Sequence, residues 1–260
     1  MRTLWIVALV LIVPAVLLSP LERAIDAQRV RRRYGGARVT LEMRDRLGQG
    51  MAIGLLAGFR GVVADFLWIQ NQGFWENKEW LRMYRNMELV TTLQPQSVLF
   101  WDSAQWHMAW NIGYAVRTDP ANRTQAEGLK REREWQEKAR DLLARGIENI
   151  PNRYELYFSM GWLYAQKLKD DCEAAEYYQH AAQFTDAPSY VGRFYARALE
   201  HCGRVPEAYE YWKHLWFQEH NKPYQLEGVL EREIKGLEDQ LNIPNDQRVF
   251  PRPAPGAKVR

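Results

Sequence analysis

Apolar side chains from Trp68 onward recur at steps of three and four residues, and no useful run alternates apolar with polar positions. This spacing is typical of helices that bury one face, so it predicts an all-α chain. A triplet of small, large aromatic and small or aliphatic residues also occurs twice, 34 residues apart: Ala174, Tyr178 and Ala181, then Ala208, Trp212 and Leu215. A 34-residue period fits a helix–turn–helix unit that must stack on neighbours to bury its apolar face. We therefore expect a solenoid of helical hairpins.

Further residues of this repeat can be placed on paired helices. The unit that begins near residue 152 carries Tyr157, Met160, Gly161 and Tyr164 on its first helix, and the triplet from Ala174 on its second. The next unit matches at Tyr195, Ala196, Leu199, Gly203, Ala208, Trp212 and Leu215. An upstream unit matches at Trp101, Ala104, Met108, Ala139, Leu143, Gly146 and Pro151. On these residues the chain resembles tetratricopeptide repeat (TPR) proteins.

The resemblance is closest over residues 152–217, weaker over 96–151 and weakest over 64–95. It implies a TPR-like solenoid of about three to four units over residues 50–222. The interval between Pro95 and Pro151 exceeds one repeat by 22 residues, and this excess is an insertion at 113–134. Loop residues at 118–124 are followed there by a charged segment, which we expect to be a solvated helix.

The N-terminal segment 3–19 contains 17 residues without a charge. As a helix it would be about 25 Å long, the lower limit for crossing a bilayer. A cleaved signal peptide is the alternative, but no small-x-small motif ends the apolar run, and Pro20 follows Ser19. We therefore expect an uncleaved anchor of a bacterial type in the cell (inner) membrane, followed by a basic juxtamembrane linker over residues 20–49.

Two features of the sequence give opposite predictions for the side of the membrane on which the solenoid lies. Arg23, Arg29 and the cluster 31–33 follow the apolar segment, and the positive-inside rule then favours a cytoplasmic domain. A hydrophobic segment that starts at residue 3 is, however, typical of a signal-anchor that exports the rest of the chain. The sequence leaves the side open.

Four glycines define a possible helix-packing face: Gly50, Gly54, Gly58 and Gly61. Gly50, Gly54 and Gly58 recur at every fourth position and Gly61 continues the same face, a pattern that lets helices pack backbone to backbone. The surrounding apolar stretch 51–69 contains Arg60 and Asp65, whose cost at a bilayer centre argues against a second span. The face is interpreted either as part of a tightly packed first helix of the solenoid or as a docking face for the anchor or a membrane partner.

The C-terminal region divides into a helix and a tail. A single apolar stripe over residues 223–243 predicts a helix that caps the solenoid: Leu226, Leu230, Ile234, Leu237 and Leu241. The following segment 244–260 is rich in proline, and we expect it to be extended.

Composition excludes several classes of function. The chain has 35 Lys and Arg against 32 Asp and Glu, with no basic stripe between residues 50 and 240, so we expect no nucleic-acid partner. No metal-ligand spacing, phosphate loop or catalytic constellation is present, so we predict no cofactor, no metal, no small-molecule substrate and no enzymatic activity.

Cys172 and Cys202 lie near the turns of successive repeats. They could approach each other, but chance placement seldom meets the distance that a disulfide requires, so their pairing stays open.

The resemblance implies a concave groove, lined by first helices, that holds a peptide or a partner subunit. With the phase given above, the groove would present nine side chains: Asp102, Trp106, Trp110, Glu155, Phe158, Trp162, Arg193, Arg197 and His201. It would be aromatic at one end and basic at the other, a combination that favours partner recognition. The expected function is therefore a membrane-anchored scaffold for protein–protein interactions. The alternative is a structural subunit of an envelope or transport assembly that makes contact through the glycine-rich helix 50–61.

Overall fold

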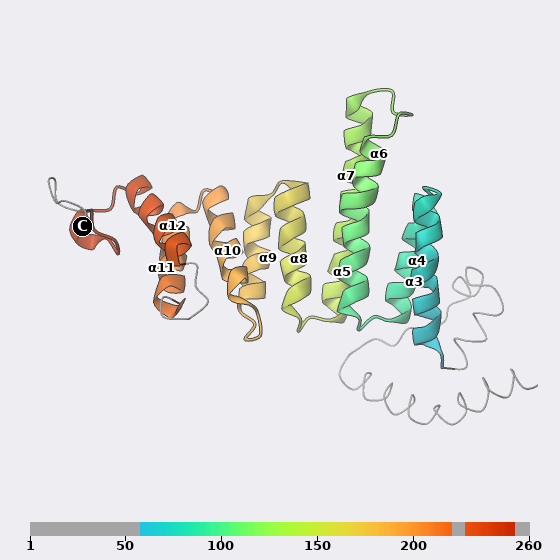
Figure 1. Ribbon diagram of the computed structural model, residues 1–260, viewed down its shortest axis with the longest axis horizontal. Helices are drawn as coiled ribbons and strands as arrows, with labels where there is room; N and C mark the ends of the chain where they lie inside the picture. The colour runs from blue at the N-terminus through green and yellow to red at the C-terminus, as the bar shows by residue number, and fades with distance from the viewer. Residues whose placement is uncertain (1–57, 220–226, 253–260) are drawn as a thin grey trace, which may run out of the picture. The chain divides into compact units, whose positions relative to one another are not determined.

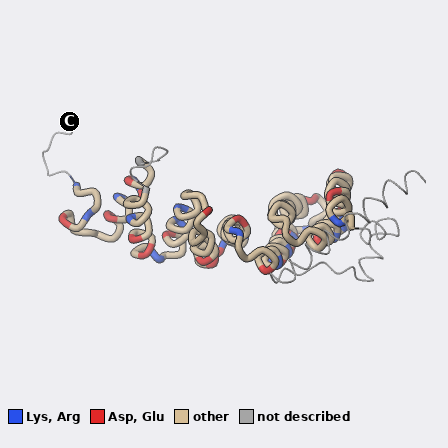
Figure 2. The backbone as a smooth tube through the Cα atoms, turned by 90° about the horizontal axis from the view of Figure 1, so that it is seen from below, with Lys and Arg blue, Asp and Glu red and all other residues tan. Residues whose placement is uncertain are grey.

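A computed structural model describes residues 58–219 and 227–252 of the chain (Figure 1). The described residues are helical and contain no strand, as the apolar spacing predicted. The helices are α3 (Arg60–Glu76), α4 (Trp80–Leu93), α5 (Val98–Trp106), the π-helical η1 (His107–Ile112), α6 (Gly113–Arg117), α7 (Gln125–Asn149), α8 (Tyr154–Leu163), the π-helical η2 (Tyr164–Leu168), α9 (Asp171–Ala182), α10 (Ser189–His201), α11 (Val205–Glu219), α12 (Glu227–Gln240) and the 3₁₀ turn η3 (Asn245–Gln247). Along them, Lys and Arg are interspersed with Asp and Glu (Figure 2).

The chain forms two compact units, which divide between Leu156 and Tyr157. In the first unit α3 packs on α4, α4 contacts α5, and the continuous rod of α5, η1 and α6 packs on α7. In the second unit η2 packs on α9, α9 on α10, α10 on α11, and α11 on α12. Each unit is thus built from antiparallel pairs of consecutive helices, and the hairpins over 152–217 have the phase that the repeat predicted.

The turn between the two helices of a hairpin has a recurring backbone conformation. Lys78, Lys169 and Gly203 each follow a first helix and adopt a left-handed φ of 56°, 59° and 82°. The next N–H donates back to a carbonyl in the last turn of that helix, as from Arg204 to Leu199 at 2.9 Å. This closure satisfies carbonyls that the helix end leaves without partners. Gly203 lies 34 residues after Lys169, so the turns follow the repeat.

Polar side chains then start the second helices. Asp170 Oδ1 accepts a hydrogen bond from the Glu173 N–H at 3.0 Å, which caps α9. Thr124 caps α7 in the same way, through the Glu127 N–H at 3.1 Å. Asp170 and Thr124 therefore stabilise the starts of these second helices.

Close packing inside the second unit depends on Gly161. A methyl group added at this position would lie 2.7 Å from ring carbons of Tyr178, the aromatic residue of the repeat triplet. The ring is buried and packs with Tyr195, Leu199 and Trp212 in one apolar core. The Trp212 Nε1–H donates to Glu200 Oε1 at 2.6 Å, so its polar atom keeps a partner.

The insertion 113–134 lengthens the second hairpin. Residues 113–117 form α6, residues 118–124 form the predicted loop, and the charged segment becomes the first part of α7. As a result α7 has 25 residues and extends beyond the end of α4 (Figure 1). The predicted charged helix is therefore present, although it is continuous with the helix that follows.

Two expectations need correction. Gly58 has a left-handed φ of 87° and lies just before α3, so one helix cannot run continuously over 50–61. Residues 244–252 of the expected extended tail instead fold back on the second unit, where Phe250 lies edge-on to Trp216 at 5.0 Å. The buried carboxylate of Glu238 accepts hydrogen bonds from the Val249 and Phe250 N–H groups at 2.5 and 3.4 Å.

Several predictions lie outside the described residues: the anchor at 3–19, the linker at 20–49 and the glycines Gly50 and Gly54. Among the helices that are described, none combines the length and apolar character needed to cross a membrane.

Candidate partner-binding surface

In the second unit, the first helices α8 and α10 share an aromatic cluster. Phe158 lies edge-on to Tyr190 and Phe194, with ring centroids 5.4 and 5.2 Å apart, and Trp162 contacts Phe194 at 5.4 Å. We call these four residues the α8–α10 cluster. The groove prediction contained Phe158 and Trp162 but missed Tyr190 and Phe194. Their spacing of four residues on α10 was the available signal.

A hollow of about 220 Å³ lies beside this cluster. Its lining residues are Tyr190, Arg193, Phe194, Arg197, Trp212 and Val229. Arg197 Nη2 donates to Glu233 Oε1 of the capping helix α12 at 2.8 Å. Because Glu233 compensates the charge of Arg197, this end of the predicted groove is less basic than expected.

Two other predicted groove residues have local partners. Glu155 accepts a hydrogen bond from Arg153 Nε at 3.1 Å, and this guanidinium holds the pKa of the Glu155 carboxyl below its usual range. His201 Nδ1 lies 3.7 Å from Asp171 Oδ1 at the hairpin end of α10. Neither residue belongs to the α8–α10 cluster.

In the first unit, the predicted Trp106 and Trp110 lie on one face of the rod of α5 and η1. Their rings stack with centroids 4.6 Å apart and an interplanar angle of 11°, and Trp106 is 44% exposed. The third predicted residue, Asp102, is half-buried and accepts a hydrogen bond from Gln105 Nε2 at 3.1 Å. The two tryptophans therefore present a flat apolar surface to solvent.

A cleft of about 450 Å³ lies between α3, α4 and η1 of the same unit. Its lining residues are Trp68, Ile69, Asn71, Gln72, Trp75, Met83, Met87 and His107. The predicted groove did not include Trp68 or Trp75, although their spacing of seven places them on one side of a helix. The cleft is lined mainly by aromatic and aliphatic side chains, as sites that bind apolar groups are.

His107 lies edge-on to both tryptophans, with ring centroids 6.3 Å from Trp68 and 5.8 Å from Trp75. Burial lowers the pKa of its imidazole, which is therefore neutral at pH 7. Its Nδ1 is 3.0 Å from Asn111 Nδ2, so the amide can donate to the neutral ring. Asn71 Nδ2 is buried without a hydrogen-bond partner among the described residues. The cleft thus combines an apolar lining with two uncharged polar groups, the His107 imidazole and the Asn71 amide.

No group of three His, Cys, Asp or Glu side chains within 58–219 and 227–252 is arranged to hold a metal ion. His201 and Cys202, neighbours in sequence, point to different partners: His201 lies near Asp171, and Cys202 is in a disulfide. The absence of enzymatic activity remains a prediction.

Cys172 and Cys202 form a disulfide, with Cα atoms 4.9 Å apart. The bond connects the first turn of α9 with the C-terminal end of α10. Consecutive helices run antiparallel, so the start of α9 lies beside the end of α10. The two cysteines therefore pair because α9 and α10 run antiparallel. The sequence spacing alone does not reveal these helix directions.

No family model matches the chain, and no curated protein matches it. Among solved structures, the chain is similar to a thermophilic TPR protein, TTC0263, from Thermus thermophilus. The identity is 14% and the TM-score 0.41, over 75% of this chain and 97% of that one. It is also similar to the MamA protein, with 17% identity and a TM-score of 0.33 over 63% and 96% of the two chains. Likenesses this distant add nothing to the TPR-like description, which rests on the hairpins and turns of this chain.

Proposed function

We propose that the chain is a membrane-anchored, TPR-like scaffold that holds a peptide segment or a partner subunit against its first helices. One observation carries the proposal. Of the five exposed Phe, Trp and Tyr side chains in the described residues, four lie on first helices: Phe66, Trp106, Tyr114 and Tyr190. The fifth is Phe217, on a second helix. Tyr and Trp are enriched among the few residues that supply most of the binding energy of protein interfaces.

The membrane anchor in this proposal is the uncharged segment 3–19. The disulfide supports a place for the domain on the non-cytoplasmic side, because cytosolic reductants keep most thiols reduced. The Arg cluster 31–33 argues for the opposite side by the positive-inside rule. We give the disulfide more weight, since it depends directly on the compartment in which the domain folds.

The compartment can be tested with the two cysteines alone, since the chain has no others. Cells are quenched with acid, and a polyethylene-glycol maleimide is added with and without prior reduction. The proposal predicts a gel shift of two maleimides only after reduction. A shift without reduction would place the domain in a reducing compartment.

Partner binding is tested with the full chain purified from its native membrane. Trp106→Ala with Tyr190→Ala should reduce recovery of a defined partner at least tenfold, while Phe217→Ala serves as the matched control on a second helix. Circular dichroism verifies that both proteins are folded. Equal recovery by the double variant and the control would contradict the assignment to first helices.

A further inference from the structure

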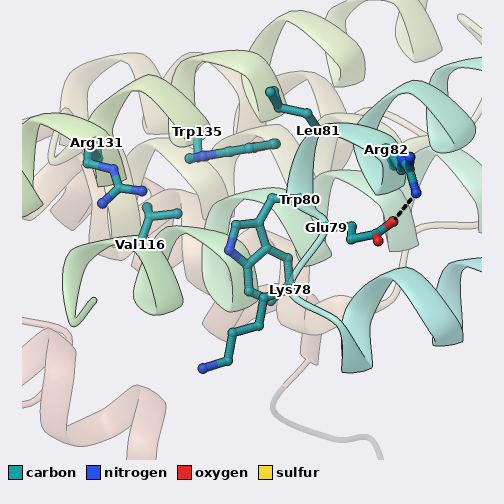
Figure 3. A pocket seen from close by; sticks show the side chains of 8 residues that line it. All are labelled: Lys78, Glu79, Trp80, Leu81, Arg82, Val116, Arg131 and Trp135. Carbon is teal, nitrogen blue, oxygen red and sulfur yellow. Dashed lines mark hydrogen bonds and ion pairs between the residues drawn. The ribbon is translucent and has the colours of Figure 1, made fainter. Parts of the chain in front are cut away.

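The insertion contributes to a second pocket, of about 570 Å³, in the first unit (Figure 3). The pocket is lined by the α3–α4 turn, the start of α4, α6 and α7: Lys78, Glu79, Trp80, Leu81, Arg82, Val116, Arg131 and Trp135. It shares no lining residue with the cleft between α3, α4 and η1. Without residues 113–134, Val116 and Arg131 would be missing from its wall.

The wall that the insertion supplies is fixed by hydrogen bonds. Asn122 Nδ2 donates to the carbonyls of Val116 and Arg117 at 2.8 and 2.9 Å. Arg131 Nη1 donates to Asn122 Oδ1 at 2.7 Å and lies 3.5 Å from Asp119 Oδ2. The Arg131 guanidinium is therefore held at the pocket and not free to fold away.

Two tryptophans supply the apolar part of the pocket. Trp135 is buried on α7 and lies edge-on to Tyr84 at 5.9 Å, while Trp80 lies edge-on to Trp75 at 5.5 Å. Leu81, beside them, is 61% exposed. In Figure 3 the Trp80 ring lies between two groups of side chains. Arg131 and Val116 are on one side of it, and the Glu79–Arg82 ion pair is on the other. The rings and Leu81 can cover an aromatic or branched aliphatic side chain of a ligand.

The charge of the lining is unbalanced. Of its three cations, Arg82 pairs with Glu79 at 2.8 Å and Arg131 pairs with Asp119 at 3.5 Å, so Lys78 supplies the excess positive charge. The Lys78 ammonium makes no hydrogen bond or ion pair with any residue the structure describes. Its charge helps to lower the pKa of the Asp119 carboxyl, after the larger effects of the Ala121 N–H and Arg131. Lys78 is thus available to a ligand carboxylate.

We infer that this pocket binds an acidic peptide segment of a partner protein, with one carboxylate at Lys78 and an adjacent apolar side chain on Trp80 and Trp135. The paired Glu79 and the apolar lining favour a peptide over a polyanion, which would need a continuous basic track. The site adds a second contact to the proposed scaffold but does not depend on the groove formed by first helices.

The test measures fluorescence anisotropy of a fluorescein-labelled hexapeptide, Ser-Asp-Phe-Glu-Asp-Gly, with the full chain in detergent. Control peptides replace the three acids by Lys or the Phe by Ala. We expect the acidic peptide to bind at least tenfold tighter than either control, and its affinity to fall with added salt. Lys78→Glu should weaken binding about tenfold or more.

Lys169→Glu is the matched control, because Lys169 has the same left-handed backbone and the same place at a hairpin turn, in the other unit. It should leave the affinity within about twofold. Trp80→Ala is a second variant, in case Lys78→Glu unfolds. Trp106→Ala with Tyr190→Ala should not change the affinity, which separates this pocket from the groove.

The inference would be overturned by no binding of the acidic peptide at about 1 mM, by equal binding of the Lys peptide, or by equal effects of Lys78→Glu and Lys169→Glu. Loss of binding in the Trp106 and Tyr190 variant, with none in Lys78→Glu, would also overturn it, since the peptide would then occupy the groove.

Discussion

The side chain at position 161 is a single hydrogen atom, and the Tyr178 ring occupies the space where a methyl group would stand. Gly161→Ala should lower the free energy of unfolding by about 1–3 kcal/mol, because the buried ring must shift inside a packed core. Gly236→Ala is the control: it lies in α12 with nothing within 4 Å of the added methyl, and should stabilise by about 0.5–1 kcal/mol. Urea unfolding measures both. Destabilisation of the same size at both positions would show that close packing at 161 is not the cause.

His107 should make stability depend on pH. Its folded pKa lies below its usual value near 6.5, so the unfolded chain takes up a proton first as the pH falls. The stability contributed by the neutral imidazole is present above about pH 6.5 and is lost as the pH falls through the folded pKa. Urea unfolding between pH 7.5 and 5 should show this loss, and His107→Gln should show less of it. Identical slopes for both proteins would contradict the role of His107.

The sequence predicted the faces of single helices better than the pairs of residues that meet on different helices. It placed Phe158, Trp162, Trp106 and Trp110 on first helices, where the structure has them. It could not give the Arg197–Glu233 pair, since the two residues meet only through the packing of α12. Helical periodicity shows which residues share a face, but it does not show which face of the next helix they meet.

At the scale of helices, the disulfide joins α9 to α10 across 30 residues. Closing a loop of that length removes unfolded-state entropy that corresponds to about 3–4 kcal/mol. Cys172→Ser with Cys202→Ser should lower the free energy of unfolding by about that amount, and a reductant should have the same effect on the wild-type chain. Reductant should not change the double variant. If the double variant were as stable as the oxidised wild type, the bond would not constrain the unfolded chain.

The helices themselves were largely predictable, because a 34-residue period constrains many positions at once. The fold-back of residues 244–252 was not, because Val249 and Phe250 are two apolar residues among prolines, without a periodic pattern. Their binding site consists of Trp216 and the buried carboxylate of Glu238. Such a contact becomes visible only when the tertiary partner is known.

At the scale of the whole molecule, the proposed scaffold combines an anchor, two units of helical hairpins and exposed aromatic rings on first helices. The anchor and the partner follow from the sequence and remain proposals. The insertion is where the sequence was least informative: its composition indicated a loop and a charged helix, but not the pocket that it forms with the α3–α4 turn. That pocket depends on residues from three separate segments of the chain.

The central claim is that first helices hold the partner, and photo-crosslinking in native membranes tests it most directly. A benzoylphenylalanine is placed at position 106, on a first helix, or at position 217, on a second helix; Trp106 is 44% and Phe217 64% exposed. We predict a discrete crosslinked partner from position 106 and none from the more exposed position 217. Equal crosslinking from both positions, or crosslinking from position 217 alone, would contradict the claim.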